Sequence, residues 1–426
     1  MESIIAISVL LLFIIVGVPI AYSLGAASLV YAMLFPNLPN MIVVQRFVRG
    51  PDSFELLAIP MFILAGSILN ESGATRRLVK FASALVGHFR GGLAQANIVA
   101  SMIFAGMSGS ANADVAGIGR VLIKAQIDEG YDADFSAAIT ASSACVGPII
   151  PPSTTMIVYG AAAEVPIATL LIAGAIPGVI MGLLMMVPTY FISKARNYPV
   201  HENFCWKRLW DATKESILIL FAPVIIIGGT LSGMFTATEA GCVAAFYALI
   251  IGAFVYREIN LQSVLNILKD MVYTSAMVMF LLACGLAFSW VLSMARVPVL
   301  MVNFITSLNL SPTAFLLACY VLFIVLGMFF SVTTNLIMVI PVLYPVVQAL
   351  GISGVQFGVL AVIGLTIGCV TPPVGAPMYL ACNFAGVSIG EFFKANKWYY
   401  VTLITSLVLV ALFPSLSTWL PSIAGL

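Results

Sequence analysis

Residues 106–114 read GMSGSANAD, and this small, polar run interrupts an apolar stretch that extends from 93 to 127. A second apolar stretch, 312–347, is interrupted in the same way by SVTTN at 331–335. Irregular backbone is tolerated at membrane depth only where protein or a water-filled cavity covers it. We therefore interpret both stretches as re-entrant helical hairpins, which enter a membrane and return to the same side.

The two interrupted stretches are related by a constant offset of 221 residues. Identical spacing over two long segments without a gap indicates an internal repeat. In each half the hairpin precedes a helix that must unwind at a Pro-Pro pair, because proline lacks the N–H donor and clashes with the preceding turn. The aligned residues are Gly106 with Gly327, Ser110 with Ser331, Gly130 with Gly351, Gly147 with Gly368, and Pro151-Pro152 with Pro372-Pro373.

The composition around these segments is that of a membrane protein. Of the 426 residues, 62% are hydrophobic and only 8% are charged, whereas soluble domains have about 25% charged residues. A soluble enzyme of this length is therefore excluded, and we expect an all-α polytopic protein that forms a single integral unit over 1–426. The net charge of +1 argues against a nucleic-acid partner.

No motif for an enzyme or an organic cofactor is present. The sequence has no Gly-Lys dipeptide, so ATP hydrolysis through a P-loop is excluded. The seven cysteines are scattered and have the pattern of small apolar filler in helices. We expect a protein that is not an enzyme.

Spanning helices are expected wherever about 20 apolar residues follow one another. We interpret 4–35 as a retained first transmembrane helix, since no basic residue precedes it and it is longer than a signal sequence. Stretches 71–92 and 257–271 mix apolar and charged residues and predict helices at the membrane interface. The remaining predicted spans are 54–70, 134–160, 165–193, 216–235, 238–256, 272–292, 353–383 and 399–420.

The basic residues predict the orientation. With a cytoplasmic N-terminus and hairpins that do not cross, 15 of the 18 basic residues fall on the cytoplasmic side. Only Arg46, Arg49 and Arg296 remain outside, as the positive-inside rule requires. The first hairpin then enters from the cytoplasm and the second from outside, so the two halves are predicted to be inverted repeats.

Each hairpin tip and its Pro-Pro break form a candidate ion site. Unwinding frees backbone carbonyls, the tip supplies hydroxyls, and the N-termini of half-helices attract anions. Such oxygen clusters suit a dehydrated alkali cation; the alternative is that small residues only permit close helix packing. The first predicted site comprises Ser108, Ser110, Asn112, Gly147, Ile150 and Pro152. The second comprises Ser331, Thr333, Asn335, Gly368, Thr371 and Pro373.

Two carboxylates stand out in the apolar segments. Asp114 is the one carboxylate at hairpin depth, where a buried charge is functional by default. It either tunes the first cation site or pairs structurally with Arg120 or Lys124. Glu239, in TATEAG, lies at a predicted helix start and is expected to cap that helix.

These residues carry a resemblance to a known family. The sequence resembles the large membrane subunit of TRAP (tripartite ATP-independent periplasmic) transporters, and the similarity spans 17–376. The stretches that carry it are GVPIAYSLG, FELLAIPMFILAGSIL, GGLAQANIVASMIFAGMSGSANADVAG, YDADFSAAITASSACVGPIIPPS, TATEAG and TPPVG.

The resemblance implies sodium-driven import of an organic acid anion across the bacterial inner membrane. It implies two partners, a small four-helix membrane subunit and a periplasmic substrate-binding protein, and Na⁺ as the coupling ion. The implied fold is an elevator, in which 93–160 and 312–383 form the transport part. Residues 1–92, 165–311 and 384–426 then form largely the scaffold, arm and connecting helices.

The resemblance leaves two matters open. Many relatives have an acidic residue after GMF of the second hairpin, whereas this chain has Ser331 after GMFF, which predicts a weaker second site. Sialic acid, C4-dicarboxylates and other small carboxylates or sulfonates all remain candidate substrates. The competing class is a channel lined by inverted re-entrant hairpins.

Overall fold

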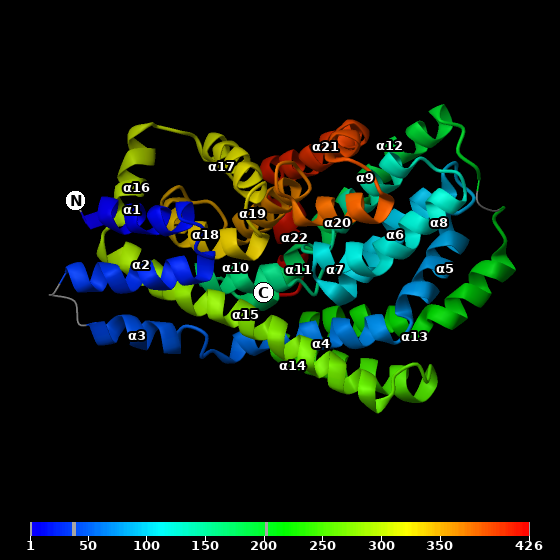
Figure 1. The fold of residues 1–426 in the computed structure, drawn as a ribbon, viewed down its shortest axis with the longest axis horizontal. Coiled ribbons are helices and arrows are strands. Elements are labelled where there is room, and N and C mark those ends of the chain that lie inside the picture. Colours follow the sequence, from blue (N-terminus) through cyan, green and yellow to red (C-terminus); the bar gives the residue numbers. More distant parts are fainter. Residues whose placement is uncertain (1, 36–39, 201–202, 426) are drawn as a thin grey trace.

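The computed structural model describes residues 2–35, 40–200 and 203–425, and within these ranges it contains helices and no strand (Figure 1). Seven helical segments are long and apolar enough to cross a membrane, by length and composition. They are Phe54–Glu71, Ile167–Ala195, Trp206–Leu231, Ala237–Val255, Leu261–Met294, Val332–Ala349 and Ile389–Leu412.

The first hairpin breaks at the predicted place. Helix α6 (Gly92–Ser108) ends at Gly109, whose φ of 59° lies in the left-handed region that glycine adopts without steric cost. The chain continues through α7 (Ala111–Asp114) and a π-helical turn, η2 (Val115–Gly119), into α8 (Arg120–Asp128). In Figure 1, α6 and α8 lie in the half of the molecule that contains α5 (Ala74–Val86).

The second hairpin also breaks where the sequence predicts. Helix α17 (Pro312–Gly327) ends before the tip, and α18 (Val332–Ala349) begins after Ser331. The Ser331 hydroxyl accepts a hydrogen bond from the Thr334 amide, which is the usual role of an N-cap serine. Helix α18 lies toward the end of the molecule that contains α16 (Val297–Ser307), opposite α5 (Figure 1).

Both Pro-Pro segments interrupt a helix, as predicted. Helix α9 (Ala133–Ala144) and α10 (Thr154–Ala163) flank the first break, and α19 (Gly354–Cys369) and α20 (Ala376–Ala385) flank the second. The Pro151-Pro152 and Pro372-Pro373 bonds are both cis. Helix α10 packs on α18 and α19, while α20 packs on α8 and α9.

The predicted first transmembrane helix over 4–35 is wrong. This segment forms two helices, α1 (Glu2–Ile15) and α2 (Ile20–Leu34), which pack against each other. The chain reverses at Gly17, with a φ of 90°, and Pro19 immediately precedes α2. The N-terminal end therefore lies on the side of α16, opposite α5 (Figure 1). The start of α1 and the basic residues of α5 thus lie at opposite ends of the molecule, so the prediction that both are cytoplasmic is wrong.

Long helices line one face of the molecule. Helix α4 (Ala58–Glu71), preceded by the 3₁₀ turn η1 (Phe54–Leu57), packs against α14 (Ala237–Ile250) and α15 (Leu261–Met294). Helix α15 starts at Leu261 and is continuous over 34 residues, so a separate interface helix over 257–271 is wrong. The interface helix expected in 71–92 corresponds to α5, which buries Leu78 and exposes Arg76.

The remaining helices complete the bundle. Glu239 and Thr236 form a capping box at the start of α14, which confirms the expected capping role of Glu239. Helix α21 packs on α9, α12 and α19. The other bounds are α3 (Asn40–Arg49), α11 (Ile167–Ala173), α12 (Ala175–Ala195), α13 (Trp206–Leu231), η3 (Ile251–Val255), α21 (Ile389–Leu412) and α22 (Ser415–Ile423).

Candidate functional site

The first hairpin tip contacts the first Pro-Pro break, backbone against backbone. A Cβ atom on Gly147 would lie 3.1 Å from the carbonyl carbon of Ser110. A Cβ atom on Gly109 would clash with the carbonyl oxygen of Pro152 and lie 3.2 Å from the Thr154 amide nitrogen. Glycine at both positions therefore allows the tip and the break to approach this closely, and the structure brings this part of the predicted first site together.

Side-chain oxygens at the first tip remain available. The Ser108 hydroxyl is buried and has no hydrogen-bond partner among the described residues. Ser110 precedes α7 without capping it through its side chain, and Ser110 and Asn112 both line a cavity. Ile150 is largely buried, and its side chain packs against Gly178 of α12, where a Cβ atom would clash with it. A buried hydroxyl without a partner is unusual and is consistent with a ligand at this position.

The second tip and break meet in a related way. A Cβ atom on Gly327 would lie 2.9 Å from the Cα atom of Gly368, so only glycine permits this approach. The Val374 amide, directly after the second Pro-Pro pair, donates a hydrogen bond of 3.1 Å to the carbonyl oxygen of Met328. Gly147 and Gly368, which are 221 residues apart, thus play the same part, because each contacts the hairpin of its own half.

The second site has fewer free oxygens than the first. The Ser331 hydroxyl lies 2.8 Å from the Thr334 hydroxyl as well as capping α18. The Thr371 hydroxyl donates to the carbonyl of Ile367 at 2.8 Å, and the carbonyl of Pro373 accepts a hydrogen bond from Tyr379 at 3.1 Å.

Asn335 supplies a buried acceptor at the second tip. Its Oδ1 is buried without a hydrogen-bond partner among the described residues, while its Nδ2 donates to the carbonyl of Phe330 at 3.2 Å. Asn335 is therefore a predicted residue of the second site whose side-chain oxygen is both buried and free. The Thr333 hydroxyl, which lines both cavities, is less buried.

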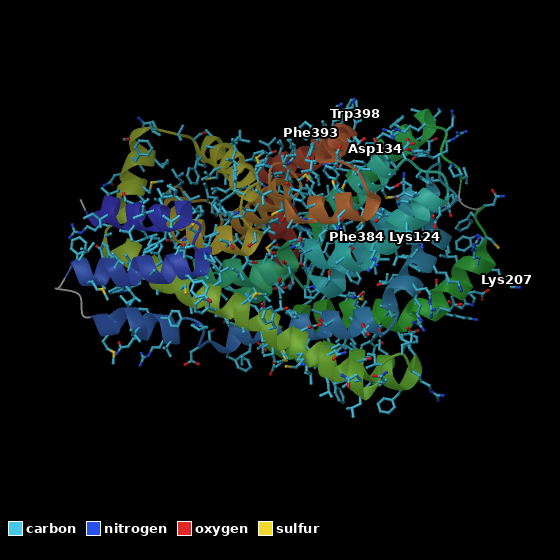
Figure 2. All side chains as sticks on the ribbon, in the orientation of Figure 1. Lys124, Asp134, Lys207, Phe384, Phe393 and Trp398 are labelled. Carbon is cyan, nitrogen blue, oxygen red and sulfur yellow. The ribbon has the colours of Figure 1, made fainter. Side chains whose placement is uncertain are left out.

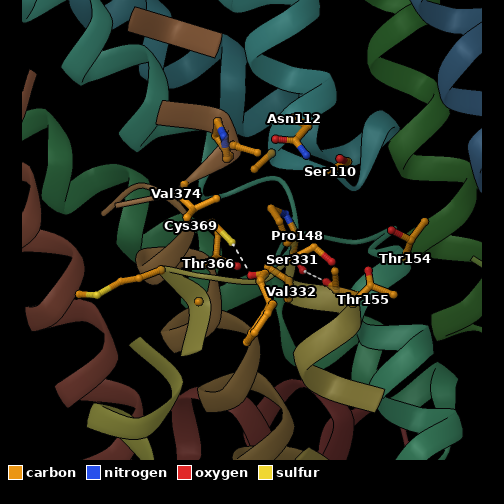
Figure 3. A pocket seen from close by; sticks show the side chains of 18 of the residues that line it. Ser110, Asn112, Pro148, Thr154, Thr155, Ser331, Val332, Thr366, Cys369 and Val374 are labelled. Carbon is orange, nitrogen blue, oxygen red and sulfur yellow. Dashed lines mark hydrogen bonds between the residues drawn. The ribbon is translucent and has the colours of Figure 1, made fainter. Parts of the chain in front are cut away.

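A cavity of about 170 Å³ lies between the two tips (Figure 3). Both tips and both breaks contribute to it, and no lysine, arginine or histidine is among the described residues that line it. The polar side chains on its wall are Ser110, Asn112, Thr154, Thr155, Ser331, Thr333 and Thr366.

Helix ends of both polarities converge on this cavity. Thr154, Val332 and Ala376 line it, and they are the first residues of α10, α18 and α20. Gly327 and Cys369 line it too, and they are the last residues of α17 and α19. Helix N-termini carry partial positive charge and C-termini partial negative charge. The cavity can therefore hold an anion and a cation without a basic side chain.

A second cavity of about 420 Å³ lies between the first tip, α4 and α15. Ser110, Thr154 and Thr333 line both cavities. The second cavity also has polar groups that are not among the predicted site residues: Ser67 and Asn70 of α4 and Thr274 of α15. Ser67 and Asn70 are three residues apart in an apolar helix and therefore lie on the same helix face. This polar face on a predicted span was the sequence feature that could have indicated the second cavity.

Asp114 does not form the structural ion pair that was one of its two predicted roles. It is 1% exposed, and neither carboxylate oxygen has a hydrogen-bond partner among the described residues. Arg120 and Lys124 are both exposed, and the Arg120 guanidinium lies 5.8 Å from the ring centre of Phe384. The other role, tuning of the cation site, stays a prediction.

Comparison with known proteins identifies the family. The family model described as "Tripartite ATP-independent periplasmic transporter, DctM component" matches residues 7–416. The chain belongs to this family. The resemblance inferred from the sequence motifs is thereby confirmed, and the protein is a large permease of the TRAP type rather than a member of an enzyme family.

The permease is similar to named TRAP permeases over nearly its whole length. It is 37% identical to the sialic acid TRAP transporter large permease SiaM of Vibrio cholerae, over 96% of this chain and 95% of that protein. It is 34% identical to the C4-dicarboxylate TRAP transporter large permease DctM of Pseudomonas aeruginosa, over 95% of each chain. In fold, it resembles the crystal structure of the YdaH transporter of Alcanivorax borkumensis, with a TM-score of 0.62, 14% identity and coverage of 97% and 98%.

Proposed function

We propose that this permease imports a small organic acid anion across the bacterial inner membrane, together with two or more sodium ions. The observation that carries the proposal is the convergence of oppositely polarised helix ends on one cavity between the hairpin tips. Membership of the TRAP family supports transport as the activity.

The anion is held by helix N-termini and hydroxyls in this proposal. Backbone N–H groups at the starts of α10, α18 and α20 suit a carboxylate or a sulfonate. The Thr333 hydroxyl adds a donor at the same wall. The hydroxyls of Thr154 and Thr155 also line it, and in this structure they donate to the carbonyls of Gly109 and Pro148. Two relatives named for sialic acid and for C4-dicarboxylates make these anions the first candidates for this permease.

The sodium ions bind where each tip meets its break. In the first site the ligands are the side-chain oxygens of Ser108, Ser110 and Asn112 and the carbonyls of Gly147, Ile150 and Pro152. In the second they are Thr333, Asn335 and the carbonyls of Gly368, Thr371 and Pro373, with Ser331 limited by its capping role. Each cation also offsets the charge of the anion beside it, so binding of the two is coupled.

We infer that the halves are inverted repeats. The Cys145 sulfur lies 3.8 Å from the carbonyl oxygen of Thr366, and these residues are 221 positions apart. A residue meets its own counterpart only near the axis that relates two halves. The hairpins approach from opposite ends of the molecule, since α6 and α8 lie with α5 while α18 lies with α16 (Figure 1).

We further propose an elevator mechanism in which 93–160 and 312–383 move against α4, α13, α14 and α15. A Cβ atom on Gly66 of α4 would lie 2.7 Å from the carbonyl oxygen of Met107, so the scaffold and the first hairpin are in close contact. Helix α21 packs on α9, and the Ser142 hydroxyl donates to Asn396 of α21 at 2.7 Å. We therefore assign α21 to the moving part, although 384–426 was predicted to be largely scaffold.

The partners in this proposal are a small four-helix membrane subunit and a periplasmic substrate-binding protein. The description of the family as tripartite and periplasmic supports both. The binding protein selects much of the cargo, and the small subunit packs on the exposed scaffold helices in the bilayer.

A binding measurement tests the substrate class. Purified permease is heated in sodium or potassium buffer with N-acetylneuraminate, succinate, isethionate or a neutral sugar. Because a ligand that binds only the folded state raises the melting temperature, one of the acids should do so in sodium and not in potassium. Stabilisation by the neutral sugar alone, or equal stabilisation in both salts, would contradict the proposal.

A further inference from the structure

A pocket of basic side chains lies between α5, α13 and η3, outside the two cavities at the tips. Arg76, Arg77 and Lys80 of α5 and Lys214 of α13 line this pocket, whose volume is about 500 Å³. Helices α5 and α13 lie in the half of the molecule that ends near Lys207 (Figures 1 and 2). The rest of the wall consists of Glu215, Leu218, Val255 and Tyr256.

The charges of this pocket are not balanced. Lys80 pairs with Glu215 at 2.6 Å, and Glu258 pairs with Arg76 at 3.2 Å and with Arg77 at 2.9 Å. Four cations thus face two carboxylates, which leaves a formal charge of +2.

Lys214 provides one of the uncompensated charges. Within the described residues no carboxylate lies at ion-pair distance from Lys214, and its ammonium lies 5.3 Å from the ring centre of Trp210. The pocket therefore favours a ligand with at least one negative charge.

The surroundings of the pocket match a lipid in position and shape. Trp206 and Trp210, at the start of α13, are 75% and 62% exposed, and exposed tryptophan favours the headgroup level of a bilayer. Ile217, Phe221 and Val224 are exposed on the same helix at spacings of four and three residues, so they form one apolar stripe. A charged pocket beside an apolar stripe suits a phosphate group that carries acyl chains.

We propose that this pocket binds the phosphate headgroup of an anionic phospholipid, with an acyl chain along the α13 stripe. Guanidinium and ammonium groups bind phosphate oxygens through charge-assisted hydrogen bonds. Helix α5 connects α4 to α6, so a headgroup held by Arg76, Lys80 and Lys214 joins this connection to α13. The proposal does not depend on which ion or cargo the permease transports.

Native mass spectrometry of the full-length permease, titrated with phosphatidylglycerol or phosphatidylcholine, tests this site. The pocket variant combines Arg76→Gln, Lys80→Gln and Lys214→Gln. Arg77 is left unchanged because it donates to the backbone carbonyls of Ser72 and Gly73, both at 3.1 Å, and supports the local fold. The matched control combines Lys124→Gln, Lys207→Gln and Lys394→Gln, which removes the same charge at exposed positions outside the pocket.

The wild type should bind phosphatidylglycerol more tightly than phosphatidylcholine. Binding should weaken on the order of a hundredfold in the pocket variant, since each basic residue contributes about fivefold, and by less than about twofold in the control. Arg76→Gln alone, at a side chain that is 78% exposed, should cost about fivefold without a risk to folding. Equal losses in pocket and control variants, or no preference for phosphatidylglycerol, would overturn the proposal. Displacement of the lipid by millimolar inorganic phosphate would overturn it too, because the site would then serve free phosphate.

Discussion

Individual side chains at the two tips differ in the oxygens that they leave free. The Ser108 hydroxyl has no hydrogen-bond partner in the part of the chain that the structure describes, whereas the Ser331 hydroxyl caps α18. The spacing of small residues was sufficient to predict which residues meet at each break. It was not sufficient to predict that Ser331 is engaged, because capping depends on the backbone dihedrals of one residue. For the same reason the buried acceptor at the second tip, Asn335 Oδ1, could not be distinguished from its neighbours.

Replacement of Gly147 by valine should abolish sodium-dependent uptake. Even a Cβ atom there would lie 3.1 Å from Ser110, and the branches of valine would separate the tip from the break. We expect uptake to fall at least about tenfold, the effect of about 1.4 kcal/mol, with normal amounts in the membrane. The control is Gly228→Val, where a Cβ atom meets nothing within 4 Å. Equal uptake by the two variants would remove Gly147 from the site.

Ser331→Asp should lower the sodium concentration for half-maximal uptake severalfold. Aspartate is as good an N-cap as serine, so α18 should keep its start. A carboxylate attracts a monovalent cation more strongly than a hydroxyl does, and the cost of burying it cancels part of the gain. Sodium is varied at saturating substrate, so that repulsion of the anion shows separately as a raised half-saturation constant. If neither constant changes, Ser331 lies outside the site.

The helices and their breaks were more predictable than the contacts between them. Both interrupted stretches and both Pro-Pro breaks were predictable, because proline and polar residues inside apolar runs give strong local signals. The junction of α9 with α12 was not predictable, since it joins residues far apart in the chain. There Arg196 donates to Asp132 at 2.7 Å and to Asp134 at 3.3 Å, and the Tyr198 hydroxyl donates to Asp132 at 2.6 Å.

This junction predicts a pH dependence of stability. The hydrogen bond from Tyr198, together with Arg196, lowers the pKa of the Asp132 carboxyl below its usual range. The contribution to stability is therefore present above the unfolded pKa of about 3.9 and is lost as the pH falls through the folded value.

Asp132→Asn should reduce the stability at pH 7 by less than about 1 kcal/mol, because the Arg196 and Asp132 side chains are partly exposed, at 35% and 56%. The difference in thermal stability between the wild type and the variant should narrow as the pH falls below about 5 and disappear below the folded pKa of Asp132, whereas Asp128→Asn should differ little from the wild type throughout. A difference that persists unchanged at pH 3 would show that the Asp132 charge does not contribute.

Across the permease, the 221-residue offset relates helices well beyond the two hairpins. Helix α5 aligns with α16, and α12 with α21, in addition to the hairpins and breaks. The reversal between α1 and α2 was missed because Gly17 and Pro19 interrupt a run that is apolar on both sides. Composition identified a membrane segment there but not the turn inside it.

The inverted arrangement predicts the sides on which single cysteines react. In a background without the native cysteines, positions 76 and 207 should react with an impermeant reagent only from the cytoplasm; Arg76 is chosen because its side chain is 78% exposed. Position 309 should react only from the periplasm, as should a cysteine near the N-terminus, because α1 and α2 turn back on themselves. Reaction of positions 76 and 309 from the same side would contradict the inverted repeats.

The proposed coupling is energetically sufficient. One charge that crosses 100 mV gains about 2.3 kcal/mol, and a tenfold gradient adds about 1.4 kcal/mol. Two sodium ions would supply about 7.4 kcal/mol, of which import of a monovalent anion consumes about 2.3. About 5 kcal/mol remains, which supports accumulation of several thousandfold, whereas one sodium ion would leave only about 1.4 kcal/mol.

The most direct test of sodium-coupled anion import is uptake into proteoliposomes that contain the large and small membrane subunits, with the binding protein outside. Uptake of the labelled acid is measured under an inward sodium gradient, under an equal potassium gradient, and without the binding protein. We predict accumulation above the outside concentration only with sodium and the binding protein together. Equal flux of the acid in sodium and potassium, without accumulation and without need of the binding protein, would identify a channel and contradict the account.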